Sequence, residues 1–138
     1  MSELSRIGVA IDSDLLKKFD VHIAKRGYTN RSEAFRDLIR DELVEKNWEL
    51  PENQVVGTVT LVYDHHVRLL NEKLTDLQHD SFHNVLSTLH VHLDHDNCLE
   101  VLVVRGKAGA VKKLADALLS TKGVKHGRLT ITSSGADL

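Results

Sequence analysis

Residues 85–104, VLSTLHVHLDHDNCLEVLVV, contain two apolar stretches on either side of a short polar segment. The stretches Val85–Leu93 and Cys98–Val104 are rich in β-branched residues and leucine, which predicts two strands. The segment Asp94–Asn97 consists mostly of Asp and Asn, which favour tight turns. We therefore expect a β-hairpin here, and the rest of the fold can be built outward from it.

The hairpin is flanked on each side by one predicted helix and one predicted strand. On its N-terminal side, Val55–Tyr63 alternates with the period of a strand and Val67–His79 has the spacing of an amphipathic helix. On its C-terminal side, Ala108–Leu119 predicts a helix, and Val124–Thr132, after Gly123, predicts the last strand. The order βαββαβ is that of the ferredoxin-like fold, whose regulatory variant is the ACT domain.

The first third of the chain has a different pattern, a short strand followed by two helices. Arg6–Ile11 alternates with the period of a strand, and Asp12–Asp14 offers a cap for the first helix. The second helix opens at Asn30, with Glu33 placed to complete a capping box. A unit of about fifty residues buries little core alone, and a lone strand leaves both edges unpaired. Pairing with the same strand of a second chain solves both problems and gives an intertwined ribbon-helix-helix dimer.

In this fold the two-stranded ribbon lies in the major groove of DNA. Arg6, Gly8 and Ala10 would face the base edges, because they alternate with the apolar residues of the strand. The lone proline, Pro51, and its polar neighbours predict a linker. We therefore expect an α+β chain with a DNA-binding domain at residues 1–48, a linker at residues 49–54 and an ACT-like domain at residues 55–138.

Composition limits the classes of partner. The net charge is −2 and neither half is basic, so any contact with DNA must be made by a few placed residues. No apolar run approaches 18 residues, which argues against a membrane span. The single cysteine makes no internal disulfide, in agreement with a cytoplasmic protein.

The predicted hairpin brings three metal-binding side chains together. His90 and His92 are two apart on a strand and share a face, about 6–7 Å apart at the backbone. The next strand begins at Cys98 and returns beside them. Two imidazoles and a thiolate suit a borderline or soft divalent cation. A fourth position remains open to water or to one of the other histidines, His22, His65, His66, His79, His83, His95 and His126.

Other interpretations of these residues stay open. A lone cysteine is often a small buried hydrophobe, and strand histidines are often ordinary polar residues. Cys98 beside a histidine could be a nucleophile, but no oxyanion motif, Gly-rich phosphate loop or HExxH accompanies it, and Glu100 is the only nearby acid. We therefore expect no enzyme. The remaining alternatives are an ACT-type sensor of a small molecule with structural zinc, and a metal storage or chaperone protein.

Four segments of the chain resemble the NikR family of nickel-responsive repressors: RGYTNRSEAFRDLIRDEL, GTVTLVYDHH, LHVHLDHDNCLEVLVVRGKAG and VKHGRL. The resemblance covers nearly the whole chain. It implies one Ni(II) per subunit in a square plane of His90, His92, Cys98 and His79, the last from a neighbouring chain. It also implies that Tyr63, Gln78 and Glu100 orient these ligands through hydrogen bonds.

The same resemblance implies a homotetramer, a dimer of dimers, that binds a palindromic DNA operator and represses nickel-uptake genes. It implies no membrane partner and no small-molecule substrate. Contacts with the DNA backbone are expected from the helix N-terminus at Asn30, from Arg31 and from Arg68. Glu33 and Asp37 match a second cation site, for K⁺, at the domain junction.

The chain departs from the family at two DNA-facing strand positions. Members of the family usually carry Thr or Ser hydroxyls there, whereas this chain has Gly8 and Ala10, which offer no side-chain donor or acceptor. Only Arg6 keeps hydrogen-bonding reach, and guanine is its expected partner. We therefore expect an atypical operator or relaxed discrimination between bases.

Overall fold

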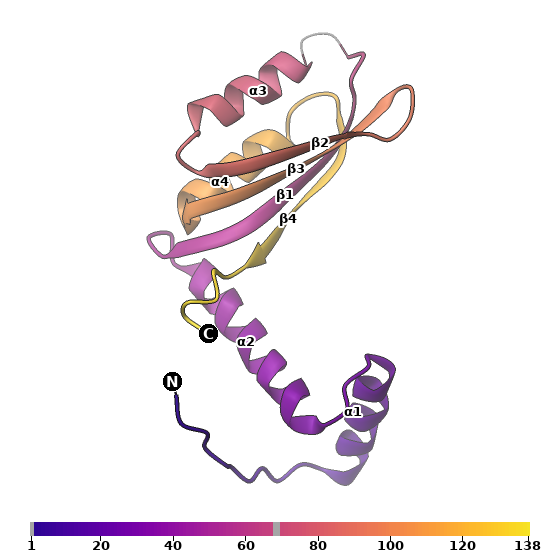
Figure 1. Ribbon diagram of the computed structural model, residues 1–138, viewed down its shortest axis with the longest axis vertical. Helices are drawn as coiled ribbons and strands as arrows, with labels where there is room; N and C mark the ends of the chain where they lie inside the picture. Colours follow the sequence, from indigo (N-terminus) through magenta and orange to yellow (C-terminus); the bar gives the residue numbers. More distant parts are fainter. Residues whose placement is uncertain (1, 68–69) are drawn as a thin grey trace. The chain divides into compact units, whose positions relative to one another are not determined.

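A computed structural model describes residues 2–67 and 70–138 of the chain. The chain folds into two compact units, Met1–Arg40 and Asp41–Leu138. The helices and strands are α1 (Ser13–Lys25), α2 (Arg31–Glu49), β1 (Gln54–Asp64), α3 (Leu70–Asp80), β2 (Val85–His92), β3 (Asn97–Lys107), α4 (Ala108–Leu119) and β4 (Val124–Thr132) (Figure 1). The α+β class is confirmed.

Both helices of the first unit begin at the predicted caps. The carboxylate of Asp12 accepts the backbone N–H of Asp14 at 2.9 Å, just before α1. The side-chain oxygen of Asn30 accepts the backbone N–H of Glu33 at 2.9 Å, at the start of α2. These bonds satisfy N–H groups that have no partner inside a helix.

Residues 2–12 form no strand, although the alternation over Arg6–Ile11 predicts one. A strand needs a neighbour to take up its N–H and C=O groups, and the expected neighbour belongs to a second chain. Ile7 and Val9 are accordingly 81% and 64% exposed. The single chain thus contains the two helices of a ribbon-helix-helix unit, with its ribbon segment unpaired.

The two helices of the first unit bury only a small core. The rings of Phe19 and Phe35 stack with centroids 5.0 Å apart, and Ile23 and Ala34 are buried. Several other large apolar side chains of this unit are exposed, among them Leu15, Val21, Leu38 and Ile39. One copy of the unit therefore leaves much of its apolar surface uncovered.

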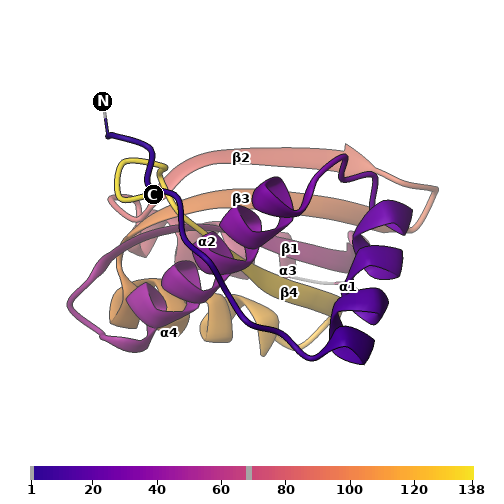
Figure 2. The same cartoon turned by 90° about the horizontal axis from the view of Figure 1, so that it is seen from below.

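The second unit contains a four-stranded antiparallel sheet in the order β2-β3-β1-β4 (Figure 2). The predicted βαββαβ order is confirmed. The bounds of α4 and β4 agree with those expected, and the other strands are one to three residues longer or shorter at their ends.

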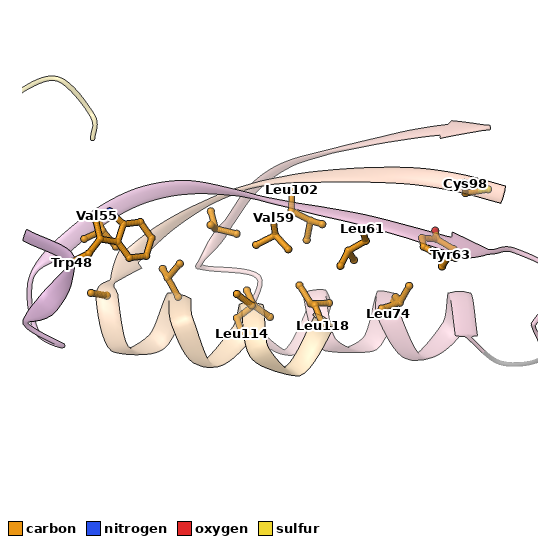
Figure 3. Packing of buried hydrophobic residues seen from close by; sticks show 14 of the residues in the cluster. Trp48, Val55, Val59, Leu61, Tyr63, Leu74, Cys98, Leu102, Leu114 and Leu118 are labelled. Carbon is orange, nitrogen blue, oxygen red and sulfur yellow. The ribbon is translucent and has the colours of Figure 1, made fainter. Parts of the chain in front are cut away.

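The core lies between the sheet and the helices α3 and α4 (Figure 3). Alternate residues of β1 are buried, which places Val59, Leu61 and Tyr63 on the face toward the helices. Leu74 of α3 and Leu118 of α4 pack against them. In residues 2–67 and 70–138, no helix is long and apolar enough to cross a membrane.

The end of α2 is built into this core. The Trp48 side chain is buried, and its indole N–H donates to the carbonyl oxygen of Thr132 at 3.0 Å. The Lys112 ammonium donates to the Trp48 carbonyl at 2.7 Å, where the last turn of a helix has free acceptors. The C-terminal turn of α2 is therefore fixed to both β4 and α4.

The predicted linker at residues 49–54 forms a turn whose carbonyls meet the start of α4. The carbonyl oxygen of Pro51 accepts the N–H of Gly109 at 3.0 Å, and that of Asn53 accepts the N–H of Ala108 at 2.8 Å. These bonds satisfy the first N–H groups of α4. The division of the chain into domains at this segment stays a prediction.

Among the described residues of the second unit, no helix covers the other face of the sheet. Its apolar residues include Leu89 and Val91 on β2, which pair with Val101 and Leu99 on β3. Leu89 is 62% exposed and Val91 38% exposed. Exposed apolar area of this kind commonly marks an interface.

We predict that Gly57→Ala destabilises the second unit by about 1–3 kcal/mol, the usual cost of overpacking. A Cβ at this position would lie 2.8 Å from the Thr130 carbonyl oxygen and 3.1 Å from the Trp48 ring. Urea unfolding followed by tryptophan fluorescence measures this change directly, because Trp48 is the only tryptophan.

Gly8→Ala is the matched control, because a Cβ there meets nothing within 4 Å. An equal midpoint for Gly57→Ala and the unmodified protein would contradict the packing described for Trp48.

Candidate metal centre

The β2-β3 hairpin fixes which side chains share one end of the sheet. His92 pairs with Cys98 and His90 with Glu100 across the two strands. On the other side of β3, Tyr63 of β1 pairs with Cys98. Because paired residues lie on the same face of a sheet, His90, His92, Cys98 and Tyr63 all lie on the face toward α3 and α4.

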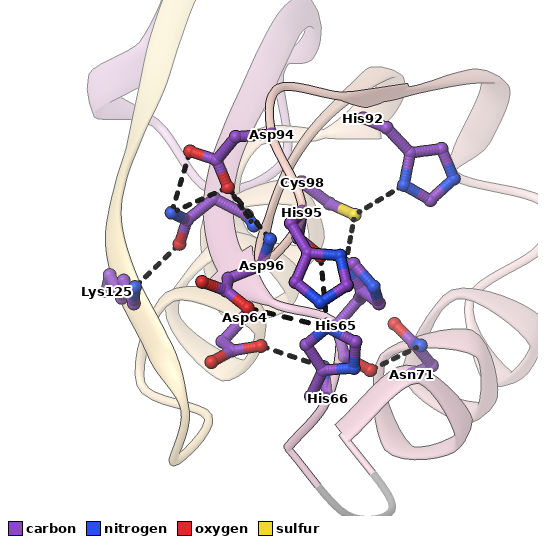
Figure 4. A network of polar contacts seen from close by, with 11 residues as sticks. Asp64, His65, His66, Asn71, His92, Asp94, His95, Asp96, Cys98 and Lys125 are labelled. Atoms are coloured by element: carbon purple, nitrogen blue, oxygen red, sulfur yellow. Dashed lines mark hydrogen bonds and ion pairs between the residues drawn. The ribbon is translucent and has the colours of Figure 1, made fainter.

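Two histidines contact the buried thiol of Cys98. Its Sγ lies 3.3 Å from Nδ1 of His92 and 3.3 Å from Nδ1 of His65 (Figure 4). The candidate ligand atoms of these three residues all lie within 4.8 Å of one another. Cys98 is fully buried, while His92 is exposed and His65 is half-buried. The hairpin thus brings His92 and Cys98 together as expected.

His65 comes from the turn that follows β1. Its backbone N–H donates to the carbonyl oxygen of Asp96 at 3.0 Å, which joins this turn to the tip of the hairpin. In the sequence, His65 was only one of seven further histidines with no reason to prefer it. The missing signal was the strand order, because β1 lies beside β3 only once the sheet is assembled.

His90 lies beside His92 but, like His79, is not a member of the three-residue group. The ring centroid of His90 is 5.3 Å from that of His92 and 6.0 Å from that of Tyr63. His79 lies in the last turn of α3 and is exposed. It does not belong to the three-residue group of the same chain. Its expected role as a ligand to a neighbouring chain's metal stays a prediction.

Glu100 joins the predicted orienting residues in one hydrogen-bonded group. The Tyr63 hydroxyl donates to Oε2 of Glu100 at 3.0 Å, and the Gln78 amide donates to Oε1 at 2.9 Å. The carboxylate of Glu100 is buried, with 6% of the residue exposed. Since Gln78 precedes His79 in α3, this group connects that helix to β3 and β1.

Burial raises the pKa values of two side chains in this region. It raises the pKa of the Cys98 thiol, and the carboxylates of Asp64, Asp94 and Glu100 raise it further. Burial, followed by the charge of Glu100, also raises the pKa of the Tyr63 hydroxyl. A cation bound to the thiolate would offset both the burial and the nearby negative charge.

The hairpin turn is held by the carboxylate of Asp94. Its Oδ1 accepts the N–H of Asp96 at 2.9 Å and that of Asn97 at 2.8 Å. These hydrogen bonds, with that from the Asn97 side chain, lower the pKa of Asp94. The Lys125 ammonium of β4 donates to the Asn97 side chain at 2.6 Å. The turn between His92 and Cys98 is therefore restrained from several sides.

A second group of candidate ligands lies at the surface of the same turn. His66, His95 and Asp96 are all exposed, and their ligand atoms lie within 4.8 Å of one another. Nε2 of His66 is 3.0 Å from the His95 carbonyl oxygen and 3.5 Å from Oδ1 of Asp96. These contacts already account for the grouping, as exposed polar residues commonly contact one another.

The donor set at this end of the sheet fits nickel. Imidazole nitrogens suit Ni(II), Cu(II) and Zn(II), and a thiolate favours the softer of these ions. His92 and Cys98 supply one of each from adjacent strands, with His90 on the same face. The two contacts to Sγ at 3.3 Å place imidazole nitrogens at separations that one shared ion can bridge.

The predicted DNA-facing residues lie in the unpaired N-terminal segment. Arg6, Gly8 and Ala10 are all exposed there. Arg31 is different, because its guanidinium makes two hydrogen bonds of 2.8 Å to the carboxylate of Asp20 on α1. This pairing lowers the pKa of Asp20. Arg68 lies outside the described residues.

The residues predicted to hold K⁺ already have protein partners. The carboxylate of Glu33 pairs with Arg36. The carboxylate of Asp37 accepts the Tyr28 hydroxyl at 2.5 Å and pairs with Arg40 at 3.0 Å. The Tyr28 hydrogen bond is the main cause of the lowered pKa of Asp37. The two carboxylates lie one turn apart on α2 without sharing a partner in these contacts.

Comparisons with known proteins give the class of each half of the chain. Residues 5–46 match the model of the ribbon-helix-helix protein of the CopG family, and residues 56–132 match the NikR C-terminal nickel-binding domain. The first unit therefore carries a DNA-binding class of fold, and the second carries a nickel-binding one.

Two relatives match the chain over its full length. A nickel-responsive regulator of Solibacter usitatus is 80% identical over all of this chain and 99% of its own length. One of Geobacter sulfurreducens is 61% identical over the same shares. A solved structure, an uncharacterized protein of Thermotoga maritima, covers 59% of this chain and 100% of its own at 13% identity and a TM-score of 0.53, which shows the fold alone.

The chain thus belongs to a class of two-part transcription regulators that join a DNA-binding unit to a metal-binding unit. Within that class it is a member of the NikR family of nickel-responsive regulators. This family regulates transcription and is not a family of enzymes, which confirms that expectation.

We predict that Tyr63→Phe lowers the free energy of unfolding by about 1.5–3 kcal/mol, the range for a hydrogen bond to a charged group. The variant removes the hydroxyl that donates to buried Glu100. Urea unfolding of the metal-free protein measures the change.

Glu100→Gln provides the second arm of a double-mutant cycle. In that background the acceptor is neutral, so Tyr63→Phe should cost about 0.5–1.5 kcal/mol. The same cost in both backgrounds would mean that the carboxylate charge does not strengthen this hydrogen bond.

We predict that the carboxyl of Asp20 titrates with a pKa below its ordinary value of 3.8, because Arg31 stabilises the charged form. A lowered pKa in the folded state means that the stabilisation is present above the unfolded pKa and is lost as pH falls through the folded pKa. An NMR titration of the Asp20 carboxyl measures this directly.

Arg31→Ala should move the Asp20 midpoint up toward 3.8, while Arg36→Ala, whose partner is Glu33, should leave it in place. An Asp20 midpoint that is the same in all three proteins would show that the pair is absent in solution.

Proposed function

We propose that the chain represses nickel-uptake genes as a homotetramer that binds a palindromic operator when Ni(II) is bound. The observation that carries the proposal is the incomplete ligand set of one chain. Cys98 and His92 are in contact and His90 lies beside them, whereas His79 is exposed on α3, away from this group in its own chain. A fourth ligand taken from a neighbouring chain would make nickel binding depend on subunit contact.

In the proposed site, His90, His92 and Cys98 of one chain and His79 of a neighbouring chain hold one Ni(II) per subunit. Ni(II) favours a planar set of nitrogen and sulfur donors. The Glu100 carboxylate accepts a hydrogen bond from Gln78 on α3, next to His79, and another from the Tyr63 hydroxyl. These hydrogen bonds support the geometry in which α3 presents His79 to another subunit.

Two exposed apolar surfaces support the proposed assembly. In the first unit, Ile7, Val9 and Leu38 are exposed, as expected for a strand and helices that pair with a second copy. In the second unit, Leu89 and Val91 lie on the uncovered face of the sheet. We assign the first surface to the DNA-binding dimer and the second to contacts between metal-binding domains.

The proposed DNA contacts divide into base and backbone contacts. Arg6 would bind a base edge, with Gly8 and Ala10 adding no hydrogen bond, so discrimination between bases is weaker than in relatives with hydroxyls there. Asn30, Arg31 and Arg68 would contact phosphates. For Arg31 this means exchanging the Asp20 carboxylate for a phosphate, both of which a guanidinium binds in the same bidentate way.

Two further parts of the proposal concern ions and location. K⁺ bound by Glu33 and Asp37 would have to displace their present pairs with Arg36 and Arg40. Repression of genes requires access to the chromosome, so we place the protein in the cytoplasm. No membrane or small-molecule substrate enters the proposed mechanism.

The deciding experiment is fluorescence anisotropy on a labelled fragment of the gene's own upstream region, with and without one equivalent of Ni(II) per subunit, at fixed salt and K⁺. We expect Ni(II) to tighten DNA binding by about 5–150-fold, the usual range of coupling between two sites. Equal affinity with and without Ni(II) would contradict the proposal.

Two variants separate the two halves of the mechanism. Cys98→Ala should abolish tight Ni(II) binding and with it the nickel-dependent gain in DNA affinity. Arg6→Ala should keep Ni(II) binding and lose base discrimination of about 1–3 kcal/mol per site. Retained tight Ni(II) binding in Cys98→Ala would contradict the assigned ligand set.

A further inference from the structure

We propose that Thr88 on β2 is a positioning residue for nickel binding, which acts through Gln78 to hold the helix turn that carries His79. The inference rests on the proposed nickel ligands and adds a residue that is neither a ligand nor one of the expected orienting residues. Among the described residues, the Thr88 hydroxyl has a hydrogen bond with Gln78 and none with a candidate ligand.

The side-chain amide of Gln78 has a hydrogen-bond partner at each end. Its Nε2 donates to Oε1 of Glu100 at 2.9 Å, and its Oε1 accepts the Thr88 hydroxyl at 3.4 Å. Because the NH₂ end of an amide only donates and the oxygen end only accepts, these two partners fit one orientation of the amide better than the reversed one. At 3.4 Å the Thr88 hydrogen bond is long, so its main effect is on the orientation of the amide rather than on the stability of the fold.

The register of β2 explains why Thr88 can reach α3. Thr88 pairs with Leu102 and His90 pairs with Glu100, and both of these β3 residues are buried. Thr88, His90 and His92 therefore lie at every second position along β2 and share the face toward the helices. One strand thus carries two of the proposed nickel ligands and also a contact to the helix that carries His79.

The last turn of α3 depends on contacts of this kind. A helix ends with carbonyl groups that have no partner within it, so its last turn is held largely by side chains and by neighbouring elements. Gln78 attaches this turn to β3 through Glu100 and to β2 through Thr88. His79 is exposed, and among the described residues its imidazole has no hydrogen bond of its own. The direction in which α3 presents His79 therefore follows from how Gln78 is held.

Nickel makes that direction important. Ni(II) with nitrogen and sulfur donors favours a planar arrangement, so a ligand displaced from the plane binds more weakly. Groups that orient a metal ligand through a hydrogen bond typically change metal affinity by about 10–100-fold. Thr88 acts one step further away, through the orientation of Gln78, and we expect its effect to lie below that range.

The test is the Ni(II) affinity of the full-length protein, measured by competition with a chromophoric chelator. Thr88→Val keeps the shape of the side chain and removes the hydroxyl. It should weaken Ni(II) binding by more than about twofold and up to about tenfold, the range for one neutral hydrogen bond. Thr88→Ser keeps the hydroxyl and should bind Ni(II) within about twofold of the unmodified protein.

Thr130→Val is the matched control. This exposed threonine lies on β4 and has no side-chain hydrogen bond among the described residues, so the same substitution there should leave Ni(II) affinity unchanged. Urea unfolding of each metal-free variant establishes that it is folded, and Thr88→Ala replaces Thr88→Val if the latter is not.

A double-mutant cycle identifies the route of the effect. Gln78→Leu removes both ends of the amide, so in that background Thr88→Val should change Ni(II) affinity by less than about twofold. Thr88→Val should also keep the thiolate-to-Ni(II) charge-transfer absorption, because the ion remains bound to Cys98.

The proposal is overturned if Thr88→Val binds Ni(II) within about twofold of the unmodified protein, or if Thr88→Ser is as weak as Thr88→Val. It is also overturned if the loss persists in the Gln78→Leu background, if the charge-transfer absorption disappears, or if Thr130→Val reproduces the loss. Failure of the proposed function is distinguishable. In that case DNA binding would not respond to Ni(II), whereas the dependence of Ni(II) affinity on Thr88 and Gln78 would remain.

Discussion

The pairing of β3 with both of its neighbours is the constraint on which the metal-binding unit depends. Cys98 lies opposite His92 on one side and opposite Tyr63 on the other. The same register places Glu100 opposite His90, where its buried carboxylate can bind Tyr63 and Gln78. A central strand therefore determines at once where the thiol lies, which imidazoles reach it and how α3 is attached beside it.

At this end of the sheet, burial disfavours the charged side chains that metal binding would require. In the described parts of the chain, no ion pair reaches the buried Cys98 thiol or the buried Glu100 carboxylate, and burial favours the protonated thiol. The Glu100 charge is stabilised by two donors, whereas the polar contacts described for the Cys98 thiol are with the imidazoles of His65 and His92 at 3.3 Å. A bound divalent cation would supply the positive charge that stabilises the thiolate, so metal binding and the stability of this region should be coupled.

The sequence predicted most of the fold, because hydrophobic periodicity is a local property. The βαββαβ order, the bounds of α4 and β4 and the caps at Asp12 and Asn30 followed from it. What could not be predicted depends on contacts between distant segments. His65 could not be chosen until β1 was known to lie beside β3, and the pairing of Arg31 with Asp20 arises from the packing of two helices. The strand expected over Arg6–Ile11 does not form, since its expected partner would belong to a second chain.

The hydrogen bonds of Asp94 also limit how the length of the β2-β3 turn can change in evolution. The Asp94 carboxylate accepts the backbone N–H groups two and three residues ahead, so these hydrogen bonds require a fixed number of residues in the turn. Insertion or deletion of one residue between His92 and Cys98 would disrupt these hydrogen bonds and shift the pairing register of β3 by one residue. Because side chains alternate between faces, such a shift would move the thiol to the uncovered side of the sheet. The spacing between His92 and Cys98 therefore tolerates substitutions at the turn far better than any change in the number of its residues.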